Sequence, residues 1–215
     1  MTFPLLSSLI LLPLLGSLFI FFIKERTTKN YQSIKYVAIF VSFSNFIISL
    51  YLWYLFDNSI SDFQFVEEKV WIKNFINYKV GVDGISILFI ILTTFIVPLC
   101  VVSINSNIKN RLKEFLIAVL IMESFMIGVF CSLDLVIFYL FFEGGLIPMF
   151  LIIGIWGGSK RVYSAFKFFL FTLLGSILML VAIITIYWIS DTTDITILYY
   201  LGIDPSYQKL LWLAF

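Results

Sequence analysis

Three carboxylates lie in or against strongly apolar stretches of this chain. Glu143 stands inside "FYLFFEGGLIPMFLIIGIWGG" (Phe138–Gly158), Glu123 stands inside "LIAVLIMESFMIGVF", and Asp134 lies in the short sequence "CSLDL". A carboxylate in apolar surroundings can take up and release a proton, because burial and neighbouring charges change which of its two forms is favoured. The chain has no histidine, so imidazole-based acid–base and metal chemistry is excluded. Proton chemistry here would use carboxylates, lysines, tyrosines or water.

The composition indicates that these acids lie in a membrane protein. Of the 215 residues, 61% are hydrophobic and 13% are charged, whereas soluble domains are about 45–50% apolar and about 25% charged. The net charge of +1 gives no indication of nucleic-acid binding. The two cysteines, Cys100 and Cys131, fall at the ends of apolar runs, and we interpret them as small buried hydrophobic residues rather than a disulfide or a metal site.

Six apolar runs are long enough to cross a bilayer core of about 30 Å. A backbone in lipid must satisfy its own hydrogen bonds, so each run is expected to be a helix and the fold to be an all-α integral membrane domain over residues 1–215. The final "LLWLAF", from Leu210, is expected to begin a seventh helix that is truncated, in a cut chain or one part of a split subunit. The six expected spans are Pro4–Ile23, Tyr36–Phe56, Ile85–Ile104, Phe115–Leu133, Leu135–Ile155 and Ala165–Ile189.

Basic residues are distributed unevenly between the connections. Lys and Arg are concentrated on the cytoplasmic or matrix side of membrane proteins, so the N-terminus is predicted on the opposite, outer side. The longest connection, Asp57–Gly84, would also lie outside, as an interfacial loop with aromatic anchors. Ten basic residues lie on the predicted inner side, namely Lys24, Arg26, Lys29, Lys35, Lys109, Arg111, Lys113, Lys160, Arg161 and Lys167. Four lie on the outer side, namely Lys69, Lys73, Lys79 and Lys209.

The short connection around Leu133 forces the fourth and fifth spans into an antiparallel hairpin. Asp134 at this turn is expected to cap the fifth helix. Glu123 and Glu143 each lie ten residues from Leu133, which places both about 15 Å deep at 1.5 Å per residue. Depth follows from this spacing, whereas the direction in which either side chain points does not.

The residues around Glu143 favour a function over a simple packing role. Gly144 and Gly145 leave room for another helix or for water, and Pro148 is expected to kink the helix because it cannot donate to the carbonyl of Gly144. Intramembrane acids usually mark ion or proton pathways. The alternatives are a protonated glutamate that hydrogen-bonds a neighbouring helix, and glycines that form a packing notch.

A lysine partner for Glu143 is not evident among these residues. Lys167 lies about eight residues from the turn near Gly158 and Glu143 about fifteen, so their depths differ by about 10 Å. Lys167 is therefore expected to extend to the interface. A partner lysine, if one is used, would lie beyond Phe215.

The sequence resembles the chain 4 family (chain M in bacteria) of NADH–quinone oxidoreductase, or respiratory complex I. The segments that carry the resemblance are "FYLFFEGGLIPMFLIIGIWGG", "AFKFFLFTLLGSILMLVAI", "GVDGIS" and the final "LLWLAF". The resemblance implies an antiporter-like fold of about fourteen helices in two inverted five-helix units, of which this chain holds the N-terminal part. It also implies that Glu143 transfers protons under the control of a lysine on the following broken helix, and that Glu123 is a second candidate.

The resemblance implies a proton-translocating membrane-arm subunit that couples quinone reduction to proton pumping. NADH, FMN, the iron–sulfur clusters and quinone would then bind other subunits, and this chain would hold no redox centre or cofactor. Its partners would be the lipid bilayer, other membrane-arm subunits and, in a split protein, a second chain with the remaining helices. The membrane would be the bacterial cytoplasmic or mitochondrial inner membrane, with the N-terminus on the periplasmic or intermembrane side. The alternatives are a subunit of a multi-subunit sodium/proton antiporter and a truncated structural or assembly fragment.

Overall fold

The computed structural model describes residues 4–23, 28–72, 76–104, 111–202 and 204–214. Within them, all six expected spans are present as helices that are long and apolar enough to cross a membrane. The boundaries differ from the predicted ones by a few residues, except that two helices extend further into polar sequence at their N-terminal ends. The helices are α1 (Leu5–Phe22), α2 (Thr28–Leu55), α3 (Ser86–Ser103), α4 (Leu112–Cys131), α5 (Leu135–Trp156) and α6 (Arg161–Ser190).

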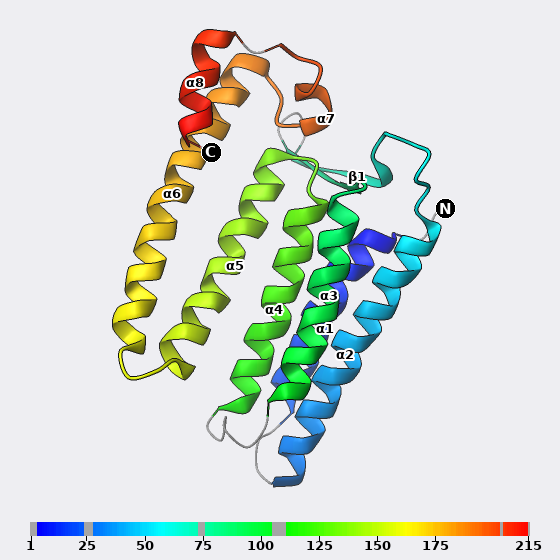
Figure 1. Ribbon diagram of the computed structural model, residues 1–215, viewed down its shortest axis with the longest axis vertical. Coiled ribbons are helices and arrows are strands. Elements are labelled where there is room, and N and C mark those ends of the chain that lie inside the picture. The colour runs from blue at the N-terminus through cyan, green and yellow to red at the C-terminus, as the bar shows by residue number, and fades with distance from the viewer. Residues whose placement is uncertain (1–3, 24–27, 73–75, 105–110, 203, 215) are drawn as a thin grey trace.

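The six helices form a group of four with two further helices added in sequence (Figure 1). Helix α1 packs against α2 and α4, and α3 packs against α2 and α4, so α1–α4 make a closed group. Helix α5 then packs on α4, and α6 packs on α5. Their outward faces carry many exposed large apolar side chains, as lipid-facing surfaces do.

The connection between α2 and α3 was predicted as an interfacial loop with aromatic anchors, and the prediction of a loop was wrong over most of its length. It forms an antiparallel hairpin of β1 (Gln64–Ile72) and β2 (Ile76–Val82). The aromatic and β-branched residues that looked like interfacial anchors also favour strands. Val80 and Val82 are fully buried in the cluster that includes residues of α1, α3 and α4. The hairpin therefore covers one end of the bundle, called the hairpin end below.

The chain after α6 also begins its next helices earlier than predicted. A short helix α7 (Ile195–Leu198) follows α6, and then α8 (Pro205–Ala214) lies beside α6 (Figure 1). The helix expected from Leu210 therefore starts at Pro205, where proline is favoured as the first helical residue because its missing N–H is not needed. Pro205 and the polar residues after it carry no apolar signal that would have marked this start.

Carboxylates cap the helices α1, α3 and α5 at the hairpin end. Glu67 of β1 accepts hydrogen bonds from the backbone of Leu6 (2.9 Å) and Ser7 at the start of α1. Asp83 accepts from the Ser86 N–H at 2.7 Å before α3. Asp134 accepts from Val136 and Ile137 at 2.8 and 3.2 Å, so the predicted capping of α5 is confirmed. An acid at a helix N-terminus is stabilised by the unpaired N–H groups and the helix dipole.

Basic side chains cap the same three helices at the opposite end. The Nζ of Lys113 donates to the carbonyls of Phe21 and Ile23, at 2.7 and 2.8 Å, at the end of α1. Lys35 does the same for α3, with 2.5 Å to the Ile104 carbonyl, and Arg161 donates to the Ile155 carbonyl of α5 at 2.7 Å. These charges complement the negative ends of the helix dipoles.

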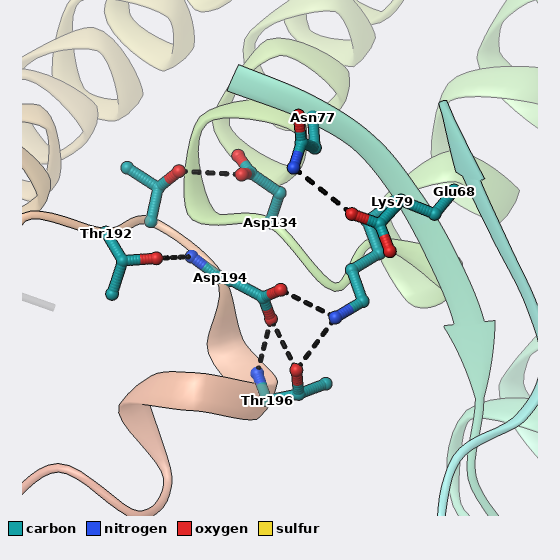
Figure 2. Close-up of polar contacts among 8 residues, drawn as sticks. Glu68, Asn77, Lys79, Asp134, Thr192, Asp194 and Thr196 are labelled. Carbon is teal, nitrogen blue, oxygen red and sulfur yellow. Dashed lines mark hydrogen bonds and ion pairs between the residues drawn. The ribbon is translucent and has the colours of Figure 1, made fainter. Parts of the chain in front are cut away.

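The α4–α5 turn is tied to both the hairpin and the segment that follows α6. The backbone N–H of Leu133 donates to the Lys79 carbonyl of β2 at 3.0 Å, and Ile195 donates to the Leu133 carbonyl at 2.9 Å. The Thr193 hydroxyl donates to Asp134 at 2.6 Å. Lys79 forms an ion pair of 2.6 Å with Asp194, whose carboxylate also accepts from Thr196 (Figure 2). This network is called the turn network below. It fixes the N-terminal end of α5, the helix that carries Glu143.

The two aspartates of the turn network respond to pH with opposite signs. Burial would raise the pKa of Asp194, but hydrogen bonds from Lys79 and Thr196 outweigh it and the pKa is lowered. For Asp134, burial dominates over the bonds from Thr193 and the backbone, and the pKa is raised. A lowered pKa stabilises the folded chain above the ordinary Asp value of about 3.9, and this contribution is lost as the pH falls through the folded value.

We therefore expect the stabilising contribution of Asp194 to disappear in acid. An Asp194→Asn variant should be less stable than the parent chain near neutral pH, and this difference should shrink as the pH falls below about 4. Thermal unfolding of the purified chain in detergent at a series of pH values measures it. An Asp194→Asn variant whose deficit grows as the pH falls would contradict the sign of the shift.

Close packing between α4 and α5 depends on glycines. A Cβ on Gly128 would lie 2.5 Å from the ring of Phe141, and a Cβ on Gly144 would lie 2.9 Å from Phe125. The rings of Phe125 and Phe141 themselves stand 6.3 Å apart. The two aromatic side chains therefore interlock with glycine notches on the facing helix, and the notch interpretation of Gly144 is confirmed.

A methyl group at Gly128 should disturb this contact. We expect Gly128→Ala to lower the free energy of unfolding by about 1–3 kcal/mol, because Phe141 must leave its position. Gly175→Ala in α6 is the matched control, since nothing lies within 4 Å of a Cβ there, and better helix propensity should make it neutral or stabilising. Thermal unfolding in detergent compares the two. Equal stability of both variants would show that Phe141 adjusts freely.

Candidate proton-binding site

Glu143 lies on the side of α5 that faces α6. Its side chain is half-buried, and its buried Oε1 has no hydrogen-bond partner among the described residues. One helical turn earlier, the Tyr139 hydroxyl is in hydrogen-bonding contact with Glu143 and with Ser176 of α6. Ser176 is itself buried and donates to the Leu173 carbonyl at 2.9 Å. Glu143 thus contacts the Tyr139 hydroxyl, which in turn contacts Ser176, and it keeps one oxygen free for a further donor.

Pro148 lies inside α5, five residues beyond Glu143. Helix α5 is continuous from Leu135 to Trp156, so the proline does not end it. Proline has no N–H, and therefore the carbonyl of Gly144 receives no bond from that position. This carbonyl belongs to the residue that follows Glu143, so the bond that proline removes lies next to the carboxyl group along the helix.

Glu123 faces the opposite direction, into the α1–α4 group. It is fully buried, and its Oε1 accepts a hydrogen bond of 2.8 Å from Nδ2 of Asn45 on α2, which is also fully buried. Oε2 of Glu123 and Oδ1 of Asn45 have no partners among the described residues. The site at Glu123 therefore has one donor for three acceptor oxygens.

The two glutamates lie at similar depths but do not form one site. The contacts of Phe125 with Gly144 and of Phe141 with Gly128 set the register of α4 against α5. In that register Glu143 lies about three residues, or about 4.5 Å along the axis, nearer the turn than Glu123. The predicted similarity in depth is confirmed to within one helical turn. Within the described residues no hydrogen bond links the two carboxyls, because one points to α2 and the other towards α6.

Cations do not approach either glutamate in the described part of the chain. The ion pairs found there are Lys79–Asp194 and Arg111–Glu114. Lys167 is exposed, in agreement with the prediction that it does not pair with Glu143. Of the other basic residues counted for orientation, Lys24, Arg26, Lys73 and Lys109 lie outside the described residues.

Metal binding finds no support in the described residues. They contain no group of three His, Cys, Asp or Glu side chains that could hold an ion. Cys100 and Cys131 are both free, as predicted. The prediction that both are buried was wrong for Cys100, which lies on an exposed face of α3. An apolar run does not reveal which of its faces points to lipid.

Three residues of the two sites were missed from the sequence. Asn45 interrupts the apolar run "AIFVSFSNFIISL" and could have been flagged as a polar residue within a span. Tyr139 precedes Glu143 by four residues, which is one helical turn. Ser176 carries no local signal, because its role depends on how α6 rotates against α5.

Comparison with known proteins supports the class indicated by these features. Residues 132–215, from the α4–α5 turn through Glu143 to α8, match the family described as "NADH:quinone oxidoreductase/Mrp antiporter, TM". With six membrane-spanning helices and two intramembrane carboxyl groups, the chain has the all-α membrane fold expected for the N-terminal part of an antiporter-like subunit.

More particularly, the chain is similar to NADH-ubiquinone oxidoreductase chain 4 of Marchantia polymorpha, with 48% identity over 98% of this chain and 42% of the relative. It is 51% identical to NADH-quinone oxidoreductase subunit M of Rhodobacter capsulatus over 86% of this chain and 38% of that relative. The resemblance inferred from the sequence is therefore confirmed. The chain spans about two fifths of the length of these curated relatives.

Solved structures show the same fold at lower sequence identity. A chain of respiratory complex I from Thermus thermophilus superposes with a TM-score of 0.81 at 24% identity, over 97% of this chain and 42% of that chain. A chain of the Mrp complex from Dietzia gives a TM-score of 0.77 at 14% identity, over 98% of this chain and 22% of that chain. At these identities the likeness shows the fold alone.

Proposed function

We propose that this chain forms the N-terminal part of a proton-translocating membrane-arm subunit of NADH–quinone oxidoreductase, with Glu143 as its proton-transfer carboxylate. The observation that supports this most directly concerns the buried side-chain polar atoms of the described residues. The three that lack partners belong to Glu143, Glu123 and Asn45. A membrane interior rarely leaves such atoms unsatisfied without a functional reason.

Glu143 has neighbours that suit proton transfer. Tyr139 and Ser176 can pass or hold a proton as hydroxyl donors and acceptors. The unpartnered Oε1 leaves a place for water or a lysine supplied by the rest of the polypeptide. A lysine that approached or withdrew would favour the ionised or the protonated form in turn. Quinone reduction and the redox centres would reside in other subunits, and this chain would need no cofactor.

The proposed location is an energy-transducing inner membrane, with the N-terminus and hairpin end on the periplasmic or intermembrane side. The greater number of Lys and Arg residues at the opposite end supports this orientation. Other membrane-arm subunits would be its partners, together with a second chain if the remaining helices are encoded separately.

A sodium/proton antiporter subunit is the second candidate, because the matching family description also names Mrp antiporters. The similarity to chain 4 and subunit M at 48% and 51% identity favours the oxidoreductase. Proton translocation driven by NADH, measured in membrane vesicles with and without sodium, tests the proposal. Transport that requires sodium and does not respond to NADH would support the antiporter instead.

A further inference from the structure

The α1–α4 group contains a buried polar row whose residues have no assigned role in the proposed function. Three fully buried polar residues of α2, Ser42, Asn45 and Ser49, lie on one face of the helix at spacings of three and four residues. Glu123 of α4 and Thr94 of α3 contact this face, at 2.8 Å to Asn45 and 2.7 Å to Ser49. A row of this kind is uncommon in an otherwise apolar bundle.

The hydroxyl groups near Glu123 have their partners. Ser42 donates to the Ile39 carbonyl at 3.2 Å, Ser49 pairs with Thr94, and Ser124 donates to the Ile10 carbonyl at 2.5 Å. Among the described residues of this row, the buried side-chain atoms that lack a hydrogen-bond partner are therefore Asn45 Oδ1 and Glu123 Oε2. Both atoms are acceptors when Glu123 is ionised, so the pair lacks one hydrogen.

A proton on Glu123 would supply the missing hydrogen. A carboxylic acid donates from one oxygen and accepts on the other, and a carboxamide does the same from its nitrogen and oxygen. The two groups can therefore form a pair with two hydrogen bonds, Nδ2–H to Oε1 and Oε2–H to Oδ1. In the ionised state Oε2 and Oδ1 would be buried acceptors without a donor, which is costly in an apolar bundle.

We propose that Glu123 is a second proton-binding site, and that Asn45 positions it by forming this acid–amide pair with its protonated form. Release of the proton removes the hydrogen bond from Oε2–H of Glu123 to Oδ1 of Asn45. The carboxylate must then turn towards another donor such as water. Proton uptake re-forms the pair. Asn45 thus favours the protonated form of Glu123 in the packed bundle. This site is separate from Glu143, which lies on the other side of α4.

The use of this site in translocation rests on the function proposed above, whereas the acid–amide pair does not. The two can be separated by experiment. Infrared spectra report the protonated carboxyl directly, whether or not the complex pumps. Loss of pumping in a Glu143 variant tests the proposed function and leaves the spectrum of Glu123 unaffected.

The test uses the assembled membrane complex that holds this chain, in parent, Glu123→Gln and Asn45→Leu forms. The carbonyl band of the protonated Glu123 is identified as the band that Glu123→Gln removes at neutral pH. In Asn45→Leu this band should shift to higher wavenumber, or be lost if the proton is released, because the bond to its carbonyl is absent. Asn45→Ala serves in the same way if the leucine variant does not assemble.

Ser42→Ala is the matched control, since Ser42 shares the buried face of α2 but bonds its own helix. It should leave the carbonyl band of Glu123 unchanged. A parent complex without such a band at neutral pH would overturn the proposal, because Glu123 would then be ionised. A band that does not respond to either Asn45 substitution would also overturn it, because Asn45 would not hold the acid.

Discussion

Replacement of Glu143 by Gln is expected to lower proton translocation per NADH oxidised by about tenfold or more, while the complex still assembles. Gln keeps the size of the side chain and can still contact Tyr139, but it cannot release a proton. Assembly should persist because Glu143 is half-buried and forms no ion pair in the described structure. A pH-sensitive dye in proteoliposomes measures translocation, and NADH oxidation is followed in parallel.

Two variants make this result specific. Glu143→Asp keeps a carboxyl group on a shorter side chain and should retain part of the activity. Glu114→Gln removes an exposed glutamate that pairs with Arg111 at 3.7 Å, and it should pump as the parent does. Undiminished pumping by an assembled Glu143→Gln complex would remove Glu143 from the mechanism, and with it the main support for the proposed function.

The depth of the glutamates could be predicted because it depends on local geometry alone. Asp134 in a short connection fixes a hairpin, and the helical rise then places Glu123 and Glu143 within about one turn of each other. Their directions could not be predicted, because they depend on helix rotation. Asn45 and Ser176 approach from α2 and α6, which are far from the glutamates in sequence. Residues that contact only through tertiary packing leave no pattern in a single sequence.

The strands could not be predicted for a different reason. The segment with Trp71 and Tyr78 has a composition that suits both interfacial anchors and a short β-hairpin. Only the burial of Val80 and Val82 against the bundle decides between them. The same holds for the notch at Gly144, which from the sequence alone could have served water or another helix equally well.

The charge asymmetry used for orientation has a structural basis in helix capping. The acids at the hairpin end and the bases at the opposite end cap the N- and C-termini of the same helices, α1, α3 and α5. Capping would favour this arrangement in either orientation of the bundle. The charges that bear most directly on orientation are therefore those whose side chains form no capping hydrogen bond, such as Lys160 and Lys167.

Replacement of Lys79 by Met is expected to lower the free energy of unfolding by about 2–4 kcal/mol, the largest effect on stability that we predict. The ion pair with Asp194 is 2.6 Å long, and the two side chains are only 13% and 15% exposed. Removing the cation leaves a largely buried carboxylate with Thr196 as its remaining side-chain donor. The hairpin and the segment after α6 would also lose a direct link. Thermal unfolding of the purified chain in detergent measures the change.

A double substitution separates the buried charge from the lost link. Lys79→Met with Asp194→Asn removes both charges and should recover part of the stability, because most of the penalty comes from an unpaired buried carboxylate. Arg111→Met is the matched control, since its pair with Glu114 is 64% and 56% exposed, and such exposed pairs contribute at most about 1 kcal/mol. If Lys79→Met and Arg111→Met were equally mild, the turn network would owe its stability to the backbone bonds around Leu133 rather than to this ion pair.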